Sequence, residues 1–145
     1  MIQVEISEDF DPLPKLIPSE MSECISKIFS DHEKTDGSVH LIIVSDDILR
    51  KMKKQYFGLD VYTDVMTFNL EEYGENTEGE IYVSWERVVE NSKSYSVNIE
   101  HEFRRVIIHG TLHLLGYEDR SEIQKSKMTD LENKYLTQTN SFIHN

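Results

Sequence analysis

The segment from Ile99 to Leu115 constrains the fold of this chain more than any other stretch. It reads IEHEFRRVIIHGTLHLL, a helical pattern whose second half is apolar on nearly every side. A helix of this kind must be enclosed by other elements, so we expect it to be buried. The chain has 145 residues, enough for a real core around such a helix, and we assign residues 1–145 to a single domain.

The rest of the chain alternates strands and amphipathic helices. Alternating or continuous apolar residues predict strands at 2–6, 39–44, 65–70 and 80–85, the last two as a hairpin around the acidic segment 71–79. Helices are expected after Pro18 and after the capping residues Ser45, Ser84, Asn98 and Ser121, the last forming a capping box with Gln124. The order β-α-β-α-β-β-α-α-α predicts an α+β fold with a small mixed four-stranded sheet and about five helices.

The helical patterns also place apolar side chains on one face of each helix. In the helix after Pro18 the apolar face carries Met21, Cys24, Ile25, Ile28 and Phe29. The next helix has an apolar stripe of Ile48, Leu49, Met52 and Tyr56, and the last has one of Ile123, Met128, Leu131 and Tyr135. The residues from about Thr137 onward are expected to be loose.

Charge and composition limit the classes of function. Acidic residues outnumber basic ones 27 to 15, a net charge of −12 that by itself argues against nucleic-acid binding. Local basic patches can override that sum, and the densest is RKMKK at 50–54. The apolar runs are too short to span a membrane, the N-terminus lacks a signal-peptide pattern, and Cys24 is the single cysteine. We therefore expect a cytoplasmic protein without a membrane partner.

His109 and His113 are the candidate metal ligands. Residues four apart lie on one face of a helix, so the two imidazoles can converge on one ion, and Gly116 lets the chain turn so that Asp119 supplies a third ligand. Three ligands with a free fourth position are typical of a catalytic zinc site. The alternative is a pair of hydrogen-bonded core histidines, which would carry a desolvation cost if left unpaired.

The spacing HxxxHxxGxx followed by a ligand is similar to the extended metzincin motif, so the predicted helix is metzincin-like. That motif has a glutamate as general base directly after the first histidine, where this chain has Gly110. Glycine at this point either leaves space beside the metal or allows close helix packing. The sequence assigns no general base, and the catalytic residues stay unknown.

Three blocks of this sequence resemble the YbeY family of ribosomal RNA maturation factors. HGTLHLLGYED at 109–119 fits the family pattern HGxLHLxGYxH except that Asp119 replaces the third histidine. TDVMTF at 63–68, preceded by YFGLD at 56–60, resembles a second block, and GEI at 79–81 a third. The family's arginine after the tyrosine of the second block is Phe57 here.

The resemblance implies a metal-dependent endoribonuclease that acts on single-stranded RNA, with ribosomal RNA and the small ribosomal subunit as partners. It implies one Zn²⁺ ion held by His109, His113 and Asp119, and a loop from Asp60 to Asp64 that lines the cleft. We assign RNA-backbone binding to Arg50, Lys51, Lys53 and Lys54, with Arg120 as a further candidate. Two other functions remain open, a non-catalytic ribosome-assembly factor with a structural metal and a metallopeptidase.

Overall fold

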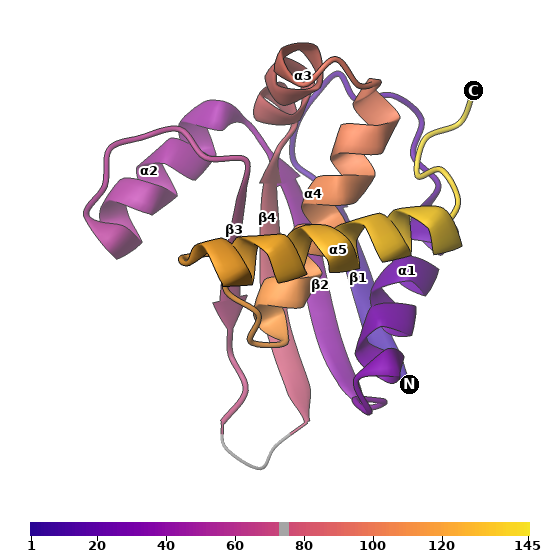
Figure 1. Cartoon of the computed structure of the whole chain (residues 1–145). Coiled ribbons are helices and arrows are strands. Elements are labelled where there is room, and N and C mark those ends of the chain that lie inside the picture. Colours follow the sequence, from indigo (N-terminus) through magenta and orange to yellow (C-terminus); the bar gives the residue numbers. More distant parts are fainter. Residues whose placement is uncertain (73–75) are drawn as a thin grey trace.

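The structure, a computed structural model, describes residues 1–72 and 76–145. The elements follow the predicted order (Figure 1): β1 (Ile2–Glu8), α1 (Pro18–Asp31), β2 (Gly37–Val44), α2 (Asp46–Phe57), β3 (Val65–Asn69), β4 (Thr77–Ser84), α3 (Trp85–Ser94), α4 (Ile99–Leu114) and α5 (Glu122–Gln138). β4 begins inside the segment expected to be a turn, and residues 73–75 of that segment lie outside the described residues. The predicted α+β class is confirmed.

The strands form one mixed sheet in the order β1-β2-β4-β3. The first three are parallel, with Val4 opposite Val39 and Leu41 opposite Ile81, while β3 runs antiparallel to β4 with Thr67 opposite Ile81. The crossover from β1 to β2 contains α1, and β3 and β4 form the predicted hairpin. β3 is thus the edge strand nearest to α2, and its far edge faces the candidate site described below.

Helices cover the two faces of the sheet unequally. α1 and α4 pack on one face and form the main core with Val39, Leu41 and Ile43 of β2. α2 packs on the other face, where a smaller cluster joins Leu49 to Ile42 and Val44. In Figure 1, α5 crosses the outer side of α4, and α2 projects to one side. None of the described helices combines the length and apolar character needed to cross a membrane.

α4 is buried as predicted, and Gly110 explains how closely it approaches the sheet. A Cβ atom at Gly110 would lie 2.9 Å from Ile81 Cγ2 and 3.0 Å from Val65 Cγ2. The missing side chain therefore points at β3 and β4. This decides between the two interpretations of Gly110 in favour of close helix packing over free space beside a metal.

The predicted helix starts are confirmed by their capping contacts. The side chains of Ser45, Ser84 and Asn98 accept hydrogen bonds from the first turns of α2, α3 and α4, and Ser121 forms its capping box with Gln124. The predicted apolar face of α1 is buried in full.

Not every residue of the predicted apolar stripes is buried. Ile48 and Tyr56 of α2 are 44% and 58% exposed, and Ile123 of α5 is 84% exposed. These helices have a neighbour on only one side, so part of each predicted stripe faces solvent. The expectation of a loose end after Thr137 is wrong. α5 continues to Gln138, Phe142 is fully buried, and Ile143 forms a β-bridge with Leu16.

Candidate metal centre

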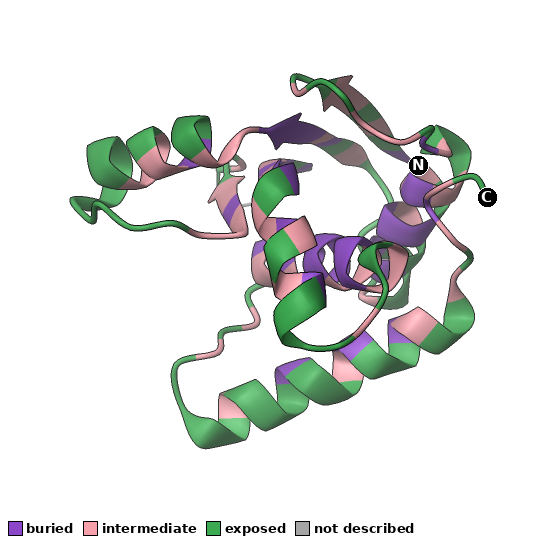
Figure 2. Ribbon diagram, turned by 90° about the horizontal axis from the view of Figure 1, so that it is seen from above, coloured by how far each residue is buried: buried purple, intermediate pink, exposed green. Residues whose placement is uncertain are grey.

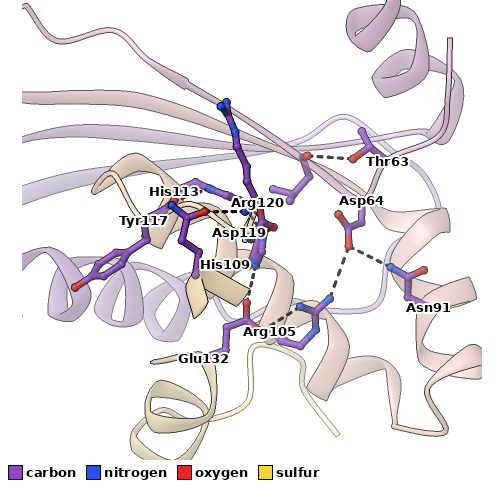
Figure 3. A network of polar contacts seen from close by, with 12 residues as sticks. Thr63, Asp64, Asn91, Arg105, His109, His113, Tyr117, Asp119, Arg120 and Glu132 are labelled. Atoms are coloured by element: carbon purple, nitrogen blue, oxygen red, sulfur yellow. Dashed lines mark hydrogen bonds and ion pairs between the residues drawn. The ribbon is translucent and has the colours of Figure 1, made fainter. Parts of the chain in front are cut away.

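The three predicted ligands come together at the C-terminal end of α4. His109 and His113 lie one turn apart, and their Nε2 atoms are 2.9 Å from each other. Gly116, with φ of +98°, takes the left-handed conformation that ends the helix and reverses the chain. The reversal brings Asp119 Oδ2 to 3.3 Å from His109 Nε2 and 3.7 Å from His113 Nε2 (Figure 3).

Hydrogen bonds at the far side of each ring fix the tautomers. His113 Nδ1 donates to the backbone carbonyl of Tyr117 at 2.8 Å, and His109 Nδ1 donates to the Glu132 carboxylate at 2.5 Å. A neutral imidazole with its proton on Nδ1 presents a lone pair at Nε2. Both lone pairs consequently point into the same small space, together with a carboxylate oxygen of Asp119.

This donor set fits a divalent cation. Four ligands held tetrahedrally at about 2.0–2.1 Å from a zinc ion are roughly 3.3 Å apart, and the three separations in this site bracket that value. Burial, and next the neighbouring His109 ring, lower the pKa of His113. A lowered pKa keeps the ring neutral, the form in which histidine binds metals. The arrangement argues against the alternative of two ordinary hydrogen-bonded core histidines, because the lone pairs repel each other without a cation between them.

A second layer of charged side chains supports His109. Glu132 of α5 is buried, and its second carboxylate oxygen accepts a hydrogen bond from Arg105 at 3.2 Å. Arg105 also binds Glu102 through two nitrogens, at 2.7 and 2.8 Å, and approaches Asp64 at 3.7 Å. The hydrogen bonds to Glu102 raise the pKa of Arg105, so it stays charged and holds Glu132 in place. Partners of this kind orient a ligating histidine and make it more basic.

The three candidate ligands line a cleft of about 450 Å³ that is open to solvent. Its walls come from α2, the loop before β3, the edge strand β3, α4 and the loop after α4. The residues that line it are Lys53, Phe57, Thr63, Asp64, Val65, Met66, Thr67, His109, His113, Glu118, Asp119 and Arg120. A polymer segment can therefore reach the ligands from outside. The histidine side chains are partly exposed, 17% for His109 and 25% for His113, as a site that must admit a reactant requires.

Comparisons with known proteins identify the family of this chain. A family model described as "Endoribonuclease YbeY" matches residues 7–140. This chain belongs to the YbeY family. Among proteins named Endoribonuclease YbeY, that of Amoebophilus asiaticus is 36% identical over 86% of this chain and 82% of its own length, and that of Bacteroides fragilis is 35% identical over 86% and 88%. The solution structure of TM1509 from Thermotoga maritima aligns with a TM-score of 0.60 at 30% identity, over 94% of this chain and 87% of that one.

The part of the chain matched to the YbeY family includes the loop between α2 and β3, which the resemblance implied would line the cleft. Thr63 and Asp64 do so. Burial raises the pKa of Asp64, which also accepts a hydrogen bond from Asn91 at 3.1 Å. Asp60 does not line the cleft, because it is exposed and pairs with Arg50 at 2.6 Å.

The four residues assigned to RNA binding lie differently on α2. Lys53 lines the cleft beside Phe57. Arg50 is engaged with Asp60 and with the Tyr62 hydroxyl, while Lys51 and Lys54 are exposed and do not belong to the cleft walls. Arg120 reaches the cleft from the loop that carries Asp119. The assignment of these residues to RNA binding stays a prediction.

The sequence reasoning missed Glu132 and Arg105. One signal for Glu132 was available, since it lies between Met128 and Tyr135 on the buried face of α5. An acidic residue at a core position of an amphipathic helix needs a buried partner. The partner itself, 23 positions earlier on another helix, does not follow from any local pattern.

Proposed function

We propose that this chain is a metal-dependent endoribonuclease that cuts single-stranded RNA and takes part in ribosomal RNA maturation. The observation that carries the proposal is the triangle of His109 Nε2, His113 Nε2 and Asp119 Oδ2 in an open cleft, with both Nδ1 atoms engaged elsewhere. The name shared by the relatives, Endoribonuclease YbeY, supports RNA as the substrate. We further propose that residues 1–145 act as one domain, in the cytoplasm, with the small ribosomal subunit as partner.

We propose that the cofactor is one Zn²⁺ ion held by His109, His113 and Asp119. Two imidazole nitrogens and one carboxylate oxygen are a donor set that suits zinc. A zinc ion bound there supplies Lewis acidity, which polarises a phosphoryl oxygen and makes water a stronger nucleophile at neutral pH.

The protein's own side chains orient the ligands and bind the substrate. Glu132 and the Tyr117 carbonyl hold the protons of both histidines on Nδ1, so that both Nε2 atoms are free to bind the ion. Lys53 from α2 and Arg120 from the loop after α4 bring positive charge to two walls of the cleft, where each can pair with an RNA phosphate. Arg50, Lys51 and Lys54 extend this basic surface along α2.

A metallopeptidase is disfavoured by the direction of Gly110. A glutamate at this position would have to displace Ile81 and Val65, because even a Cβ atom comes within 3.0 Å of both side chains. The base that a metzincin peptidase uses therefore has no room at its usual place in the motif.

The experiment compares the wild-type protein with His113→Ala and with His101→Ala as a matched control on the same helix. Elemental analysis is expected to find about one zinc ion per chain in the wild type and the control, and little in His113→Ala. Cleavage of a ribosomal precursor RNA at stated salt should be lost together with the metal. Undiminished cleavage by metal-free His113→Ala would contradict the proposal.

A non-catalytic assembly factor with a structural metal is the second candidate, and the net charge of −12 favours it. It predicts stoichiometric co-sedimentation with small ribosomal subunits without turnover of RNA. The open cleft beside the ligands favours the enzyme, because structural zinc sites have four protein ligands and exclude solvent.

A further inference from the structure

Phe57 presents an aromatic ring at the wall of the cleft that contains the three candidate ligands. It is the last residue of α2, and it is 52% exposed. A single exposed aromatic residue needs no explanation, but this one belongs to a run of exposed apolar side chains. Tyr56, Leu59, Val61 and Tyr62 are each between 48% and 58% exposed, all within residues 56–62. In Figure 2, the end of α2 and the loop that follows it are almost entirely exposed.

The Phe57 ring is supported from behind. It stacks on Phe68 of β3, with ring centroids 6.3 Å apart and planes inclined by 27°. Phe68 is itself held by edge contacts with Tyr56 and Tyr82, at 5.2 and 5.8 Å between centroids. A ring fixed in this way loses little conformational entropy when a ligand packs against it.

Positive charge lies directly beside the ring. Lys53 Nζ is 4.9 Å from the centroid of the Phe57 ring, and Lys53 lines the same cleft. Arg120 contributes a second cation from the loop that carries Asp119. An aromatic face next to cations is the combination that binds unpaired nucleotides, since the base stacks on the ring and the phosphate pairs with the cation.

We propose that Phe57 is a base-stacking platform for an unpaired nucleotide next to the phosphate that is cleaved. The base lies on the Phe57 ring, and Lys53 moves from the ring to the adjoining phosphate. A base in a duplex has both faces covered by its neighbours, so this subsite selects single-stranded RNA. The inference rests on the proposed function, because it places the scissile phosphate at the three ligands.

The preference of this subsite among the four bases should follow how strongly each base stacks on the Phe57 ring. Every base has an aromatic face, so the platform tolerates all four, and purines are expected to bind better than pyrimidines because they stack over a larger area. An abasic nucleotide at the same position keeps the phosphate contact with Lys53 but removes the stacking.

The test measures binding of a short single-stranded oligoribonucleotide by fluorescence anisotropy, with chelator-treated protein so that no cleavage occurs. Phe57→Ala and Phe57→Leu are expected to weaken binding by about 5- to 150-fold, and Phe57→Trp should bind within a few-fold of the wild type. Tyr95→Ala, which removes an exposed aromatic ring outside the cleft walls, is the control and should have no effect. Circular dichroism verifies that each variant is folded.

An abasic nucleotide moved along the oligonucleotide identifies the stacked base. At the stacked position, the abasic strand should bind the wild type and Phe57→Ala equally, because both changes remove the same contact. Equal binding of the intact strand to wild type and Phe57→Ala would overturn the inference and favour a protein partner for residues 56–62. Absence of RNA binding by the wild type would also overturn it.

Loss of the platform and loss of the nuclease activity are distinguishable. If the metal-loaded wild type cuts RNA while Phe57→Ala binds RNA normally, the proposed function stands and the platform does not. If Phe57→Ala weakens binding but the metal-loaded wild type does not cut RNA, the stacking contact stands, while the nuclease assignment and the position of a scissile phosphate beside it fail.

Discussion

Individual residues determine whether two histidines can act as ligands or are ordinary core side chains. For His109 this residue is Glu132, which fixes the orientation of the ring and keeps its proton on Nδ1. The residue types and the spacing of four predicted that His109 and His113 converge, and a glycine followed by an acid predicted that Asp119 joins them. Glu132 was not predictable, because its contact with His109 depends on the angle at which α5 crosses α4. A buried carboxylate that binds both a ligating histidine and an arginine fixes the direction of the ring.

Glu132→Gln should lower zinc affinity by about 10- to 100-fold. Glutamine keeps the shape and one acceptor atom, but it removes the negative charge that makes His109 more basic and that pairs with Arg105. Competition against a zinc chelator measures the change. Glu122→Gln, on the same helix but with a 96% exposed side chain, is the matched control, and equal zinc affinities of the two variants would contradict the role given to Glu132.

Among the elements, α4 shows which structural features a local sequence pattern predicts and which it does not. Its length, its cap at Asn98 and its burial all follow from the sequence, because they depend on periodicity and on capping chemistry. The face that it turns to the sheet does not follow, since Gly110 has two reasonable explanations until Ile81 and Val65 are seen beside it. The exposed Ile48 and Ile123 have the same origin, because a helical stripe does not reveal how many neighbours cover it.

Gly110→Ala is expected to destabilise the protein by about 1 kcal/mol. Alanine gains about 1 kcal/mol in helix propensity, but an added methyl in a tight core position costs about 1–3 kcal/mol. The second effect should win, because Ile81 Cγ2 and Val65 Cγ2 would both have to move. Urea unfolding measures the difference. The control is Ser126→Ala at an exposed position of α5, which changes helix propensity without overpacking the core. A Gly110→Ala protein that is more stable than the wild type would contradict the close packing of Gly110 against Ile81 and Val65.

For the whole molecule, the order of the elements and the mixed sheet were predictable, but the packing of the C-terminal segment against the core was not. The sequence suggested a loose end, whereas Phe142 packs edge-on against Phe103 of α4, with centroids 6.2 Å apart, and Ile143 pairs with Leu16. A short segment without helical or alternating pattern carries no local sign that it is buried. Its position is fixed by partners that lie 39 and 127 positions earlier in the sequence (142 − 103 and 143 − 16).

Phe142→Ala should lower the free energy of unfolding by about 3–5 kcal/mol, the usual cost of removing a buried phenyl ring. Thermal and urea unfolding measure this loss. His144→Ala changes an exposed side chain two positions later and should leave stability within about 0.5 kcal/mol of the wild type. A Phe142→Ala protein of normal stability would mean that the segment does not belong to the core.

The position of α5 on the outside of α4 links the candidate metal centre to a helix that is largely exposed to solvent. Much of α5 is exposed, yet it carries the carboxylate that steadies His109 (Figure 2). Peripheral helices with few buried side chains detach in partial openings that leave the central sheet intact. On warming, catalytic competence should therefore fade several degrees before the sheet melts, and a bound metal ion should delay both events.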